Sequence, residues 1–295
     1  MNERDPLLEA SGVTAQDLPA GALYVVATPI GNAADITLRA LWVLAQVDAI
    51  AAEDTRATRP LLARYGIERP LLAAHEHNEN EVAEKLVARL AAGERIALVT
   101  DAGTPAVSDP GARLVRAVRA AGLRVVPIPG ASSVLAALAA AGLSADAFAF
   151  LGFPPHAAGA RRTWLAAAAA RADAFVLLEA PHRLRATVAQ LAELLDPGRR
   201  VVVARELTKK FETIAETNAA ALPALIAAAE PRGEYVLLVD AAPAAAAPSE
   251  IDAATARWLA ALAEELPPAR AAAVATRATG LPREVLYAAL GARRR

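Results

Sequence analysis

Short apolar runs alternate with amphipathic runs from residue 22 to residue 142. The apolar runs are ALYVVA (22–27), DAIAAE (48–53), PLLAA (70–74), RIALVT (95–100) and RVVPI (124–128). The amphipathic runs are ITLRALWVLAQ (36–46), TRPLLARYG (58–66), ENEVAEKLVARLAAG (79–93), GARLVRAVRAAG (111–122) and ASSVLAALAAAG (131–142). Near-continuous apolar strands between amphipathic helices predict a parallel or mixed sheet covered on both faces.

The second half of the chain repeats this alternation with different contents. Strands are expected at AFAFLGF (147–153), AFVLLEA (174–180), RVVVARE (200–206), FETIAET (211–217) and EYVLLVDA (234–241). Helices are expected at ARRTWLAAAAARA (160–172), HRLRATVAQLAELL (182–195) and AALPALIAAAE (220–230). The adjacent strands around LTKK indicate a partly antiparallel sheet. We place the domain boundary near residues 142–147, with an N-terminal α/β domain at 21–145 and a C-terminal one at 146–240.

The two ends of the chain have a different pattern. Residues 1–20 have little periodicity and are expected to form a flexible arm. AAPAAAAPSE (241–250) is typical of a linker. Residues 251–295 contain three short helical runs, and Gly280, Leu281 and Pro282 between the last two indicate a small helix-turn-helix-like tail. From Pro267 onward this tail is rich in arginine, so it is locally basic.

Composition narrows the function classes. The 295 residues have a formal net charge of -1, so attraction to nucleic acid must come from local patches. The count of 0 cysteines excludes disulfides, thiolate metal sites and cysteine nucleophiles. The N-terminus lacks the pattern of a signal peptide, and charges interrupt every apolar segment before about 18 residues. We expect a soluble cytoplasmic protein.

Three loops that follow predicted strands have an unusual composition. They are ATPIGN (27–32), DAGTPAVSDPG (101–111) and PGASS (129–133). Gly and Pro beside small polar residues allow the backbone to approach a ligand, and ligands of open α/β sheets bind beyond the strands' carboxyl ends. Neither G-x-G-x-x-G nor G-x-x-x-x-G-K-[ST] occurs, which disfavours a dinucleotide or a phosphate-cradled nucleotide. The alternative is that these loops are only tight turns.

The motifs VATPIGNAADITLRAL, AEDTR, DAGTPAVSDPG, IPGASS, GFPP, LEAPHR, ARELTKKFE and GEYVLLV occur in this order. This set resembles the ribosomal RNA small subunit methyltransferase I family of the tetrapyrrole methylase superfamily over about residues 21–240. The basic tail is similar to that family's helix-turn-helix segment. The resemblance implies two α/β domains with S-adenosylmethionine in the cleft between them, and a homodimer. It also implies methylation of a cytidine ribose 2′-hydroxyl in the decoding centre of 16S RNA.

Carried over position by position, the resemblance implies a cofactor site. Its residues would be Thr28, Pro29, Asp101, Gly103, Thr104, Ser132, Ser133, Leu207 and Gly233. The departures from the family pattern are Ala33, where leucine is usual, and Phe211, where histidine is frequent.

Methyl transfer to a ribose hydroxyl requires in-line placement of the hydroxyl and a proton acceptor. Charged residues at strand ends qualify, and we favour Lys209 with Glu206 as the deprotonating or charge-stabilising set, with Glu179 as a further catalytic candidate. Glu53 at the end of another strand also qualifies. Only three of the 31 basic residues are lysines, which makes the adjacent pair at 209–210 distinctive. The alternative is a solvated turn with an ion pair.

Substrate contacts are expected from other basic residues. The candidates for RNA contacts are Arg56, His182, Arg183, Arg205 and Lys210, against the alternative that the arginines only favour solubility and that His182 only begins a helix. Phe153 is the aromatic candidate for stacking on an unpaired cytidine. The histidines show no metal-binding spacing, and no metal is expected at His75–His77.

Two other functions remain open from the sequence. A precorrin-type methylase acting on a tetrapyrrole would use the same cofactor cleft but would leave the basic tail unexplained. A regulator that senses a metabolite and binds DNA would use the tail, although PREVLYAAL offers only Arg283 along its second helix.

Overall fold

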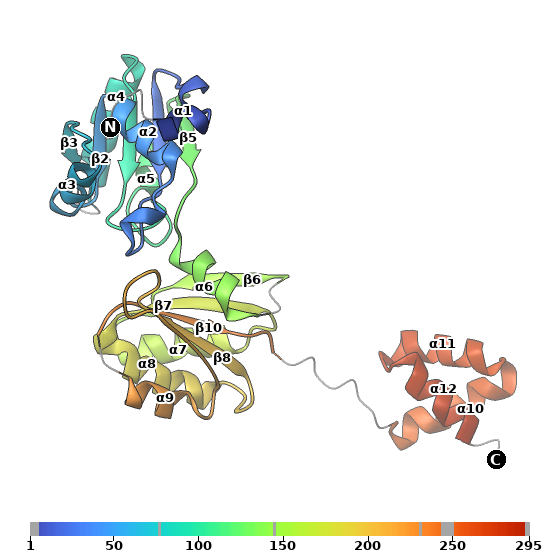
Figure 1. Cartoon of the computed structure of the whole chain (residues 1–295). Helices are drawn as coiled ribbons and strands as arrows, with labels where there is room; N and C mark the ends of the chain where they lie inside the picture. The colour runs from blue at the N-terminus through green and yellow to red at the C-terminus, as the bar shows by residue number, and fades with distance from the viewer. Residues whose placement is uncertain (1–5, 76–77, 144–145, 230–231, 243–250, 293–295) are drawn as a thin grey trace. The chain divides into compact units, whose positions relative to one another are not determined.

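A computed structural model describes residues 6–75, 78–143, 146–229, 232–242 and 251–292. The chain divides into two compact units, residues 1–241 and 242–295. The first unit contains two five-stranded sheets, and the second contains three helices (Figure 1).

The first sheet is parallel throughout. Its strands are β1 (Ala22–Val26), β2 (Ala49–Ala52), β3 (Leu71–Ala73), β4 (Ile96–Val99) and β5 (Arg124–Ile128). Their order is β3-β2-β4-β1-β5, with Tyr24 of β1 opposite Ala97 on one side and Val126 on the other. The carboxyl ends of β1, β4 and β5 are therefore neighbours, so the three loops singled out in the sequence start from one edge of the sheet.

Helices cover both faces of this sheet, as the alternation of apolar positions requires. On one face Tyr24 and Val26 pack with α2 (Leu38–Gln46) and with Leu62 of α3 (Thr55–Arg64). On the other face Leu23 packs with α4 (Glu79–Ala91) and α5 (Ala112–Ala120).

The N-terminal segment differs from the flexible arm that the sequence predicts. Residues 6–15 form helix α1 (Pro6–Ala10) and a 3-10 turn, η1 (Val13–Ala15). Leu8 and Val13 are only 3% and 2% exposed and join the core around α2. Burial of these two apolar side chains offsets the entropy of ordering a short polar segment.

The second sheet is mixed, as predicted from the strands around LTKK. Its strands are β6 (Phe148–Gly152), β7 (Ala174–Glu179), β8 (Arg200–Arg205), β9 (Thr213–Asn218) and β10 (Tyr235–Val239), in the order β6-β7-β10-β8-β9. β6 and β7 are parallel, and all other neighbours are antiparallel. The antiparallel β8–β9 pair places its connecting loop, 206–212, beside the start of β10.

Helices also cover both faces of the second sheet (Figure 1). On one face lie α7 (Ala158–Ala169), α8 (Pro181–Leu194) and α9 (Leu222–Ala228), packed on Phe175, Leu177 and Leu237. On the other lies α6 (Ser133–Ala141), packed on Val176, Val202 and Leu238.

Helix α6 thus belongs to the second sheet, whereas the predicted boundary near residues 142–147 assigns it to the first domain. The physical reason is its composition: α6 consists of Ser, Val, Leu and Ala, and its Val134, Ala137 and Ala141 complete a core with Val176 and Leu238. Strand β5 is followed directly by the PGASS loop, so the chain passes from one sheet to the other within residues 129–132.

The second unit has a core of its own. It consists of α10 (Ala253–Glu265), α11 (Pro268–Thr279) and α12 (Arg283–Ala292), around Leu259, Ala272 and Leu286. Gly280 ends α11 with φ +72, a left-handed conformation that glycine adopts without strain. Most of the predicted linker, residues 243–250, lies outside the described residues. Among the described helices, none is long and apolar enough to cross a membrane.

Candidate functional site

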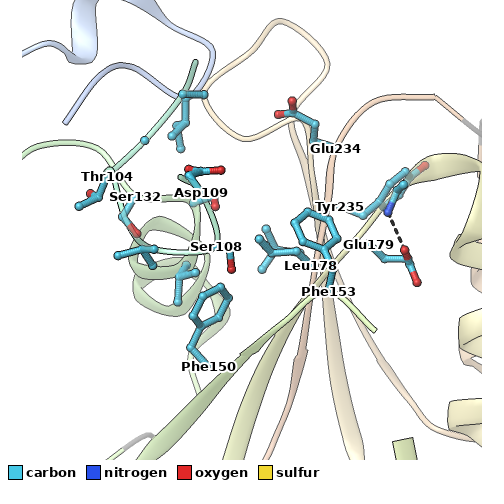
Figure 2. Close-up of a pocket in the computed structure, with 18 of the residues that line it drawn as sticks. Thr104, Ser108, Asp109, Ser132, Phe150, Phe153, Leu178, Glu179, Glu234 and Tyr235 are labelled. Carbon is cyan, nitrogen blue, oxygen red and sulfur yellow. Dashed lines mark hydrogen bonds between the residues drawn. The ribbon is translucent and has the colours of Figure 1, made fainter. Parts of the chain in front are cut away.

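Loops from the first sheet and residues of the second sheet line a common cavity of about 300 Å³ (Figure 2). The first sheet contributes Ile30 and residues 102–104 and 107–109. The start of α6 contributes Ser132, Ser133 and Val134. The second sheet and its loops contribute Phe150, Phe153, Leu178, Glu179, Ala180, Pro181, Glu234, Tyr235 and Val236. Its wall is therefore apolar with a few hydroxyls and carboxylates, as in many small-molecule sites.

The loops after β1 and β4 support each other through their backbones. Thr28 N donates to Gly103 O at 2.8 Å, and Gly103 N donates to Thr28 O at 3.0 Å. Gly103 has φ +82, which an L side chain rarely adopts. The Thr28 side chain is buried and donates to Thr100 O at 3.1 Å. Thr28 therefore holds the two loops together beneath the cavity, and Gly103 presents bare backbone at its wall.

The PGASS loop joins the same wall. Thr104 Oγ1 donates to Ala131 O at 3.2 Å, which ties the loop after β4 to the loop after β5. Ser132 is the N-cap of α6, and its side chain accepts from Leu135 N at 3.5 Å. The three hydroxyls of Thr104, Ser132 and Ser133 thus lie at the cavity edge on well-positioned backbone.

The second half of the loop after β4 is conformationally constrained. Ala106 and Ser108 have φ +67 and φ +63, an unusual conformation for residues with a Cβ. Ala106 N donates to Pro110 O at 3.2 Å and closes the loop on itself. Behind it, the buried Glu79 Oε1 accepts from Gly111 N at 3.0 Å and from Arg113 N at 2.9 Å. Ser108 and Asp109 are held on the cavity wall by this loop.

The loop between β8 and β9 approaches the cavity from the second sheet. Glu206 and Thr208 have φ +51 and φ +65, again left-handed without being glycine. Glu206 N donates to Glu234 O at 3.0 Å, and Glu206 Oε1 accepts from Glu234 N at 3.0 Å. Thr208 Oγ1 accepts from Asn32 N at 3.1 Å, so this loop contacts the loop after β1 directly.

Lys209 lies between two carboxylates. Its Nζ is 2.9 Å from Glu206 Oε1 and 3.1 Å from Glu234 Oε2. Partial burial lowers the pKa of Lys209, but hydrogen bonds and charges from Glu206 and Glu234 outweigh it, so the pKa is raised. The hydrogen bond from Lys209 lowers the pKa of Glu206 despite some desolvation. Lys209 is therefore a stable ammonium, and the deprotonating role considered from the sequence lacks the neighbouring cations that it requires.

The structure corrects the roles expected for Glu179 and Arg183. The Glu179 side chain is 0% exposed. Its carboxylate accepts from Ala180 N at 2.9 Å and from Thr187 Oγ1 at 2.5 Å, and lies 3.3 Å from Arg183 Nε. In Figure 2 it points away from the cavity. Arg183 donates to the carbonyls of Pro154 and Pro155. Both side chains hold the start of α8 against the GFPP loop, and neither is available to a proton donor or a phosphate.

The remaining basic candidates are accessible to different degrees. Arg56 is 89% exposed and pairs with Asp54 at 2.7 Å. His182 is exposed at the start of α8, and Lys210 is exposed in the loop between β8 and β9, with its Nζ 5.4 Å from the ring centre of Phe211. Arg205 donates to Arg232 O at 2.9 Å, and its guanidinium carbon is 5.9 Å from the centre of the Tyr235 ring.

The nine residues predicted for the cofactor lie in three places. Gly103, Thr104, Ser132 and Ser133 line the cavity. Pro29 and Asp101 line a neighbouring cavity of about 280 Å³, together with Lys209 and Glu234. Thr28 and Leu207 are buried behind the wall, and Gly233 lies under Glu206, whose carboxylate a Cβ at Gly233 would meet at 2.6 Å.

Asp109 is a cavity residue that sequence reasoning missed. Burial raises its pKa to about 6, and the negative charges of Glu53 and Asp101 contribute to the same shift. Ser108, Phe150, Leu178, Tyr235 and Val236 were also missed. The signal for Asp109 was its place in the DAGTPAVSDPG loop, between two prolines and three residues before helix α5. For the strand residues the only signal was the alternation that turns every second side chain toward the first domain.

The comparisons with known proteins agree with this architecture. The model of the tetrapyrrole (corrin/porphyrin) methylases matches residues 22–223, and that of the RsmI C-terminal HTH domain matches residues 249–294. Ribosomal RNA small subunit methyltransferase I of Xylella fastidiosa is 48% identical over 90% of this chain and 98% of its own length. That of Mesorhizobium japonicum is 49% identical over 90% of each chain.

The chain belongs to the ribosomal RNA small subunit methyltransferase I family of tetrapyrrole methylases.

Solved structures share the fold of the first unit. The methyltransferase CobJ has a TM-score of 0.57 and 23% identity, over 76% of this chain and 95% of its own. A uroporphyrin-III C-methyl transferase from Thermus thermophilus, complexed with S-adenosyl homocysteine, has a TM-score of 0.53 and 20% identity, over 74% of this chain and 97% of its own. The predicted fold class of this family is thereby confirmed, including the helix-turn-helix-like tail.

Membership of this family confirms S-adenosylmethionine as the cofactor. The residues present fit it. The positive φ of Gly103 leaves backbone groups at the wall, and Thr104, Ser132 and Ser133 add hydroxyls. Ile30, Leu178 and Val236 provide apolar surface for a ring. Among the described residues no group of three or more His, Asp or Glu could hold a metal ion; His77 lies outside them.

Proposed function

We propose that this protein transfers a methyl group from S-adenosylmethionine to small-subunit ribosomal RNA, and that the acceptor is a cytidine ribose 2′-hydroxyl in the decoding centre of 16S RNA. The observation that carries the proposal is the loop-lined cavity, in a chain that is 48% identical over 90% of its length to a ribosomal RNA small subunit methyltransferase I. The cofactor, when bound, supplies a methyl group on a positively charged sulfur.

The walls of the cavity then have two tasks, to hold the cofactor and to exclude water. Gly103, Thr104, Ser132 and Ser133 hold the cofactor at the first-sheet wall, and their loops are cross-linked by the Thr28–Gly103 and Thr104–Ala131 hydrogen bonds. The preformed wall limits the entropy lost on binding. The apolar second-sheet wall excludes water from the reacting atoms, which strengthens electrostatic effects there.

Lys209 retains a role as a positive charge in this proposal. It lines the cavity next to the cofactor cavity, and Glu206 and Glu234 keep it protonated and hold its position. A fixed ammonium beside the acceptor attracts the RNA backbone and stabilises negative charge that develops on the ribose oxygen. Lys209 and Glu206 form the charge-stabilising set, with Glu206 acting through Lys209.

Exposed basic residues of the first unit supply RNA contacts. Arg56, His182 and Lys210 are the accessible candidates for phosphates, and Arg205 is partly accessible beside Tyr235. Phe153, which is 51% exposed and lines the cavity, can stack on an unpaired cytosine. We further propose that the protein acts as a cytoplasmic homodimer, which sedimentation equilibrium of the purified protein can test.

The proposal is tested with small ribosomal subunits from a strain that lacks this gene. Purified protein and tritiated S-adenosylmethionine are added, the 16S RNA is digested to nucleosides, and the label is expected in 2′-O-methylcytidine. Label on a base would contradict the ribose assignment. Transfer to a tetrapyrrole and none to RNA would favour the precorrin-type alternative.

A Lys209→Ala variant tests the role of the charge in the same assay. It should keep its affinity for the cofactor by calorimetry and lose methyl transfer. Lys209→Arg should retain part of the transfer if the charge is what matters. Unchanged transfer in Lys209→Ala would remove Lys209 from the mechanism.

A further inference from the structure

The ribose hydroxyl must lose a proton, and the cavity contains a carboxylate that no other part of the described chain uses. Asp109 lies on the first-sheet wall beside Ser108, with Leu178, Phe153 and Glu234 on the side of the second sheet (Figure 2). Among the described residues, no hydrogen bond or ion pair to the Asp109 carboxylate is present.

Three other acids near the cavity already have hydrogen-bond or ion-pair partners. Glu179 accepts from Ala180 N and Thr187 Oγ1, and Glu206 from Lys209 and Glu234 N. Glu234 pairs with Lys209 and is 73% exposed. A carboxylate that already accepts strong hydrogen bonds is a weak base, because those bonds favour its charged form. Asp109 accepts no such hydrogen bond in the described chain, so it is a stronger base than Glu179, Glu206 or Glu234.

The loop holds Asp109 in a defined place. Residues 106 and 108 carry positive φ angles, and strain of this kind, roughly 1–3 kcal/mol for each residue, is concentrated at functional sites. Gly111 has φ +126, and a Cβ there would lie 2.9 Å from Leu98 Cδ2, so any other residue after Pro110 would be strained. Glu79, buried behind the loop, accepts from three N–H groups at Gly111, Arg113 and Leu114. These contacts fix the backbone of the loop around Asp109 and leave the Asp109 carboxylate free of them.

The charges around Asp109 favour proton uptake. Glu53 at the end of β2 and Asp101 at the end of β4 are its negative neighbours, and burial acts in the same direction to bring its pKa to about 6. From α4 and α5, Glu79 and Arg113 lie near each other, with Arg113 Nε 4.0 Å from Glu79 Oε2. From the second sheet, Glu234 faces the cavity and is paired with Lys209. A base with a pKa near the working pH is effective in general base catalysis.

We propose that Asp109 is the general base that accepts the proton of the ribose hydroxyl. This inference rests on the proposed function. As the ribose oxygen forms its bond to the methyl carbon, the bond from that carbon to sulfur breaks and its electron pair stays on the sulfur. The hydroxyl proton passes to the Asp109 carboxylate and then to solvent, so charge and atoms balance without another reactant. Lys209 stabilises the oxygen, and Asp109 removes its proton.

The experiment compares Asp109→Asn with the wild-type protein on small subunits lacking the modification. Single-turnover rates are measured from pH 5 to 9. The wild-type rate should rise with pH and level off above an apparent pKa near 6. In Asp109→Asn this rise with pH should be absent, and the rate should be about 10²–10⁴-fold lower, which is the usual contribution of a general base. Asp109→Glu should restore part of the rate, and Glu84→Gln, an exposed acid on α4, is the matched control that should change nothing.

Two measurements do not depend on turnover. Calorimetry should give the same affinity of Asp109→Asn for S-adenosylmethionine, and carbon-13 NMR of the labelled Asp109 carboxyl should titrate near pH 6 in the cofactor-free protein. Glu53→Gln removes a neighbouring negative charge, so it should move both this titration and the rate limb to lower pH. A merely structural role for Asp109 would not produce this parallel shift.

The outcomes separate the two proposals. If the wild-type protein transfers no methyl group to ribosomal RNA, the proposed function fails. If it does and Asp109→Asn keeps its rate and pH limb, Asp109 is not the base. If Asp109→Asn loses affinity for the cofactor more than 10-fold at unchanged saturated rate, Asp109 binds the cofactor and the inference is also overturned.

Discussion

At the scale of single residues, the carboxylates near the cavity differ in whether they have hydrogen-bond partners. Glu79 is buried and accepts from N–H groups at the start of α5, and Glu179 is buried with Ala180 N, Thr187 Oγ1 and Arg183 as partners. Asp109 is partly buried and has no such partner in the described chain. A buried carboxylate with hydrogen-bond partners supports the fold, whereas burial without a partner makes the charged form of Asp109 unfavourable. We therefore expect opposite effects on the stability of the fold when the charge of Asp109 or of Glu179 is removed.

Asp109→Asn should stabilise the protein in a pH-dependent way. The pKa of Asp109 is raised to about 6 in the folded state. Folding therefore favours the protonated carboxyl, and the ionised carboxylate destabilises the folded protein. Stability is therefore lost as the pH rises from about 4 through about 6, and Asn avoids this loss. The variant should be about equal to wild type near pH 4 and more stable at pH 8 by on the order of 2 kcal/mol. Urea unfolding between pH 4 and 8 measures the difference; a gap that does not grow with pH would contradict the assigned environment.

Glu179→Gln should have the opposite effect. The change leaves Arg183, whose side chain is 10% exposed, without its buried counter-charge, and breaking such a pair costs about 3–5 kcal/mol. The matched control is Glu193→Gln, which opens the exposed pair with Arg162 and should cost less than about 1 kcal/mol. Urea midpoints of both variants test this. Equal losses would mean that the Glu179–Arg183 pair does not support α8.

The LEAPHR motif shows that the sequence predicts where a residue lies but not where its side chain points. The sequence places Glu179 and Arg183 correctly at a strand end and at the start of a helix, and it suggests catalysis and phosphate binding. What it does not give is the direction of each side chain. The four-residue spacing, which places both on one side of a helix start, was the available signal for a mutual pair.

At the scale of elements, periodicity predicts nearly every strand and helix of the first unit, because each sheet is buried on both faces and its helices have one polar side. It fails where an element lacks that contrast. Helix α6 is apolar almost all round, so the pattern does not tell which sheet it covers. Helix α1 is only one turn long, too short for a period to be visible. The left-handed residues 106, 108, 206 and 208 are likewise not encoded by glycine.

The packing of the 206–212 loop against the start of β10 gives an element-scale prediction. Gly233 has φ +96, and a Cβ there would lie 2.6 Å from the Glu206 side chain, which holds Lys209. Gly233→Ala should therefore cost about 1–3 kcal/mol and reduce methyl transfer, because the clash displaces Glu206 and with it Lys209. Gly93→Ala is the matched control: its φ is +95, but nothing lies within 4 Å of the new Cβ.

Both variants are to be compared in urea unfolding and in the transfer assay. Gly93→Ala measures the backbone strain alone, so the extra destabilisation in Gly233→Ala reports the clash with Glu206. If the two variants are equally destabilised and both keep full activity, the packing of Gly233 against Glu206 does not position Lys209.

At the scale of the whole molecule, charge is distributed unevenly between the two units. The formal net charge of the chain is -1, yet the tail contains Arg270, Arg277 and Arg283 on its last two helices and Glu284 as the acid among them. The cavity residues all belong to the first unit, residues 1–241. Catalysis and part of the RNA affinity can therefore reside in different units, each with its own core.

Replacing Arg270 and Arg277 by glutamine should weaken binding to small-subunit RNA without changing the affinity for S-adenosylmethionine. Each arginine that neutralises a phosphate releases counter-ions, so the slope of log affinity against log salt should fall by roughly 0.7–0.9 for each phosphate that is no longer neutralised. Filter binding from 50 to 200 mM salt measures the slope, and calorimetry measures the cofactor affinity. Glu264→Gln, an exposed acid of α10, is the control of opposite charge and should leave the RNA affinity equal or slightly higher. Both arginine substitutions lie on the surface of a unit with a separate core. An unchanged salt slope would therefore assign RNA binding to the first unit alone, where Arg56, His182 and Lys210 each adjoin a residue that lines one of the two cavities.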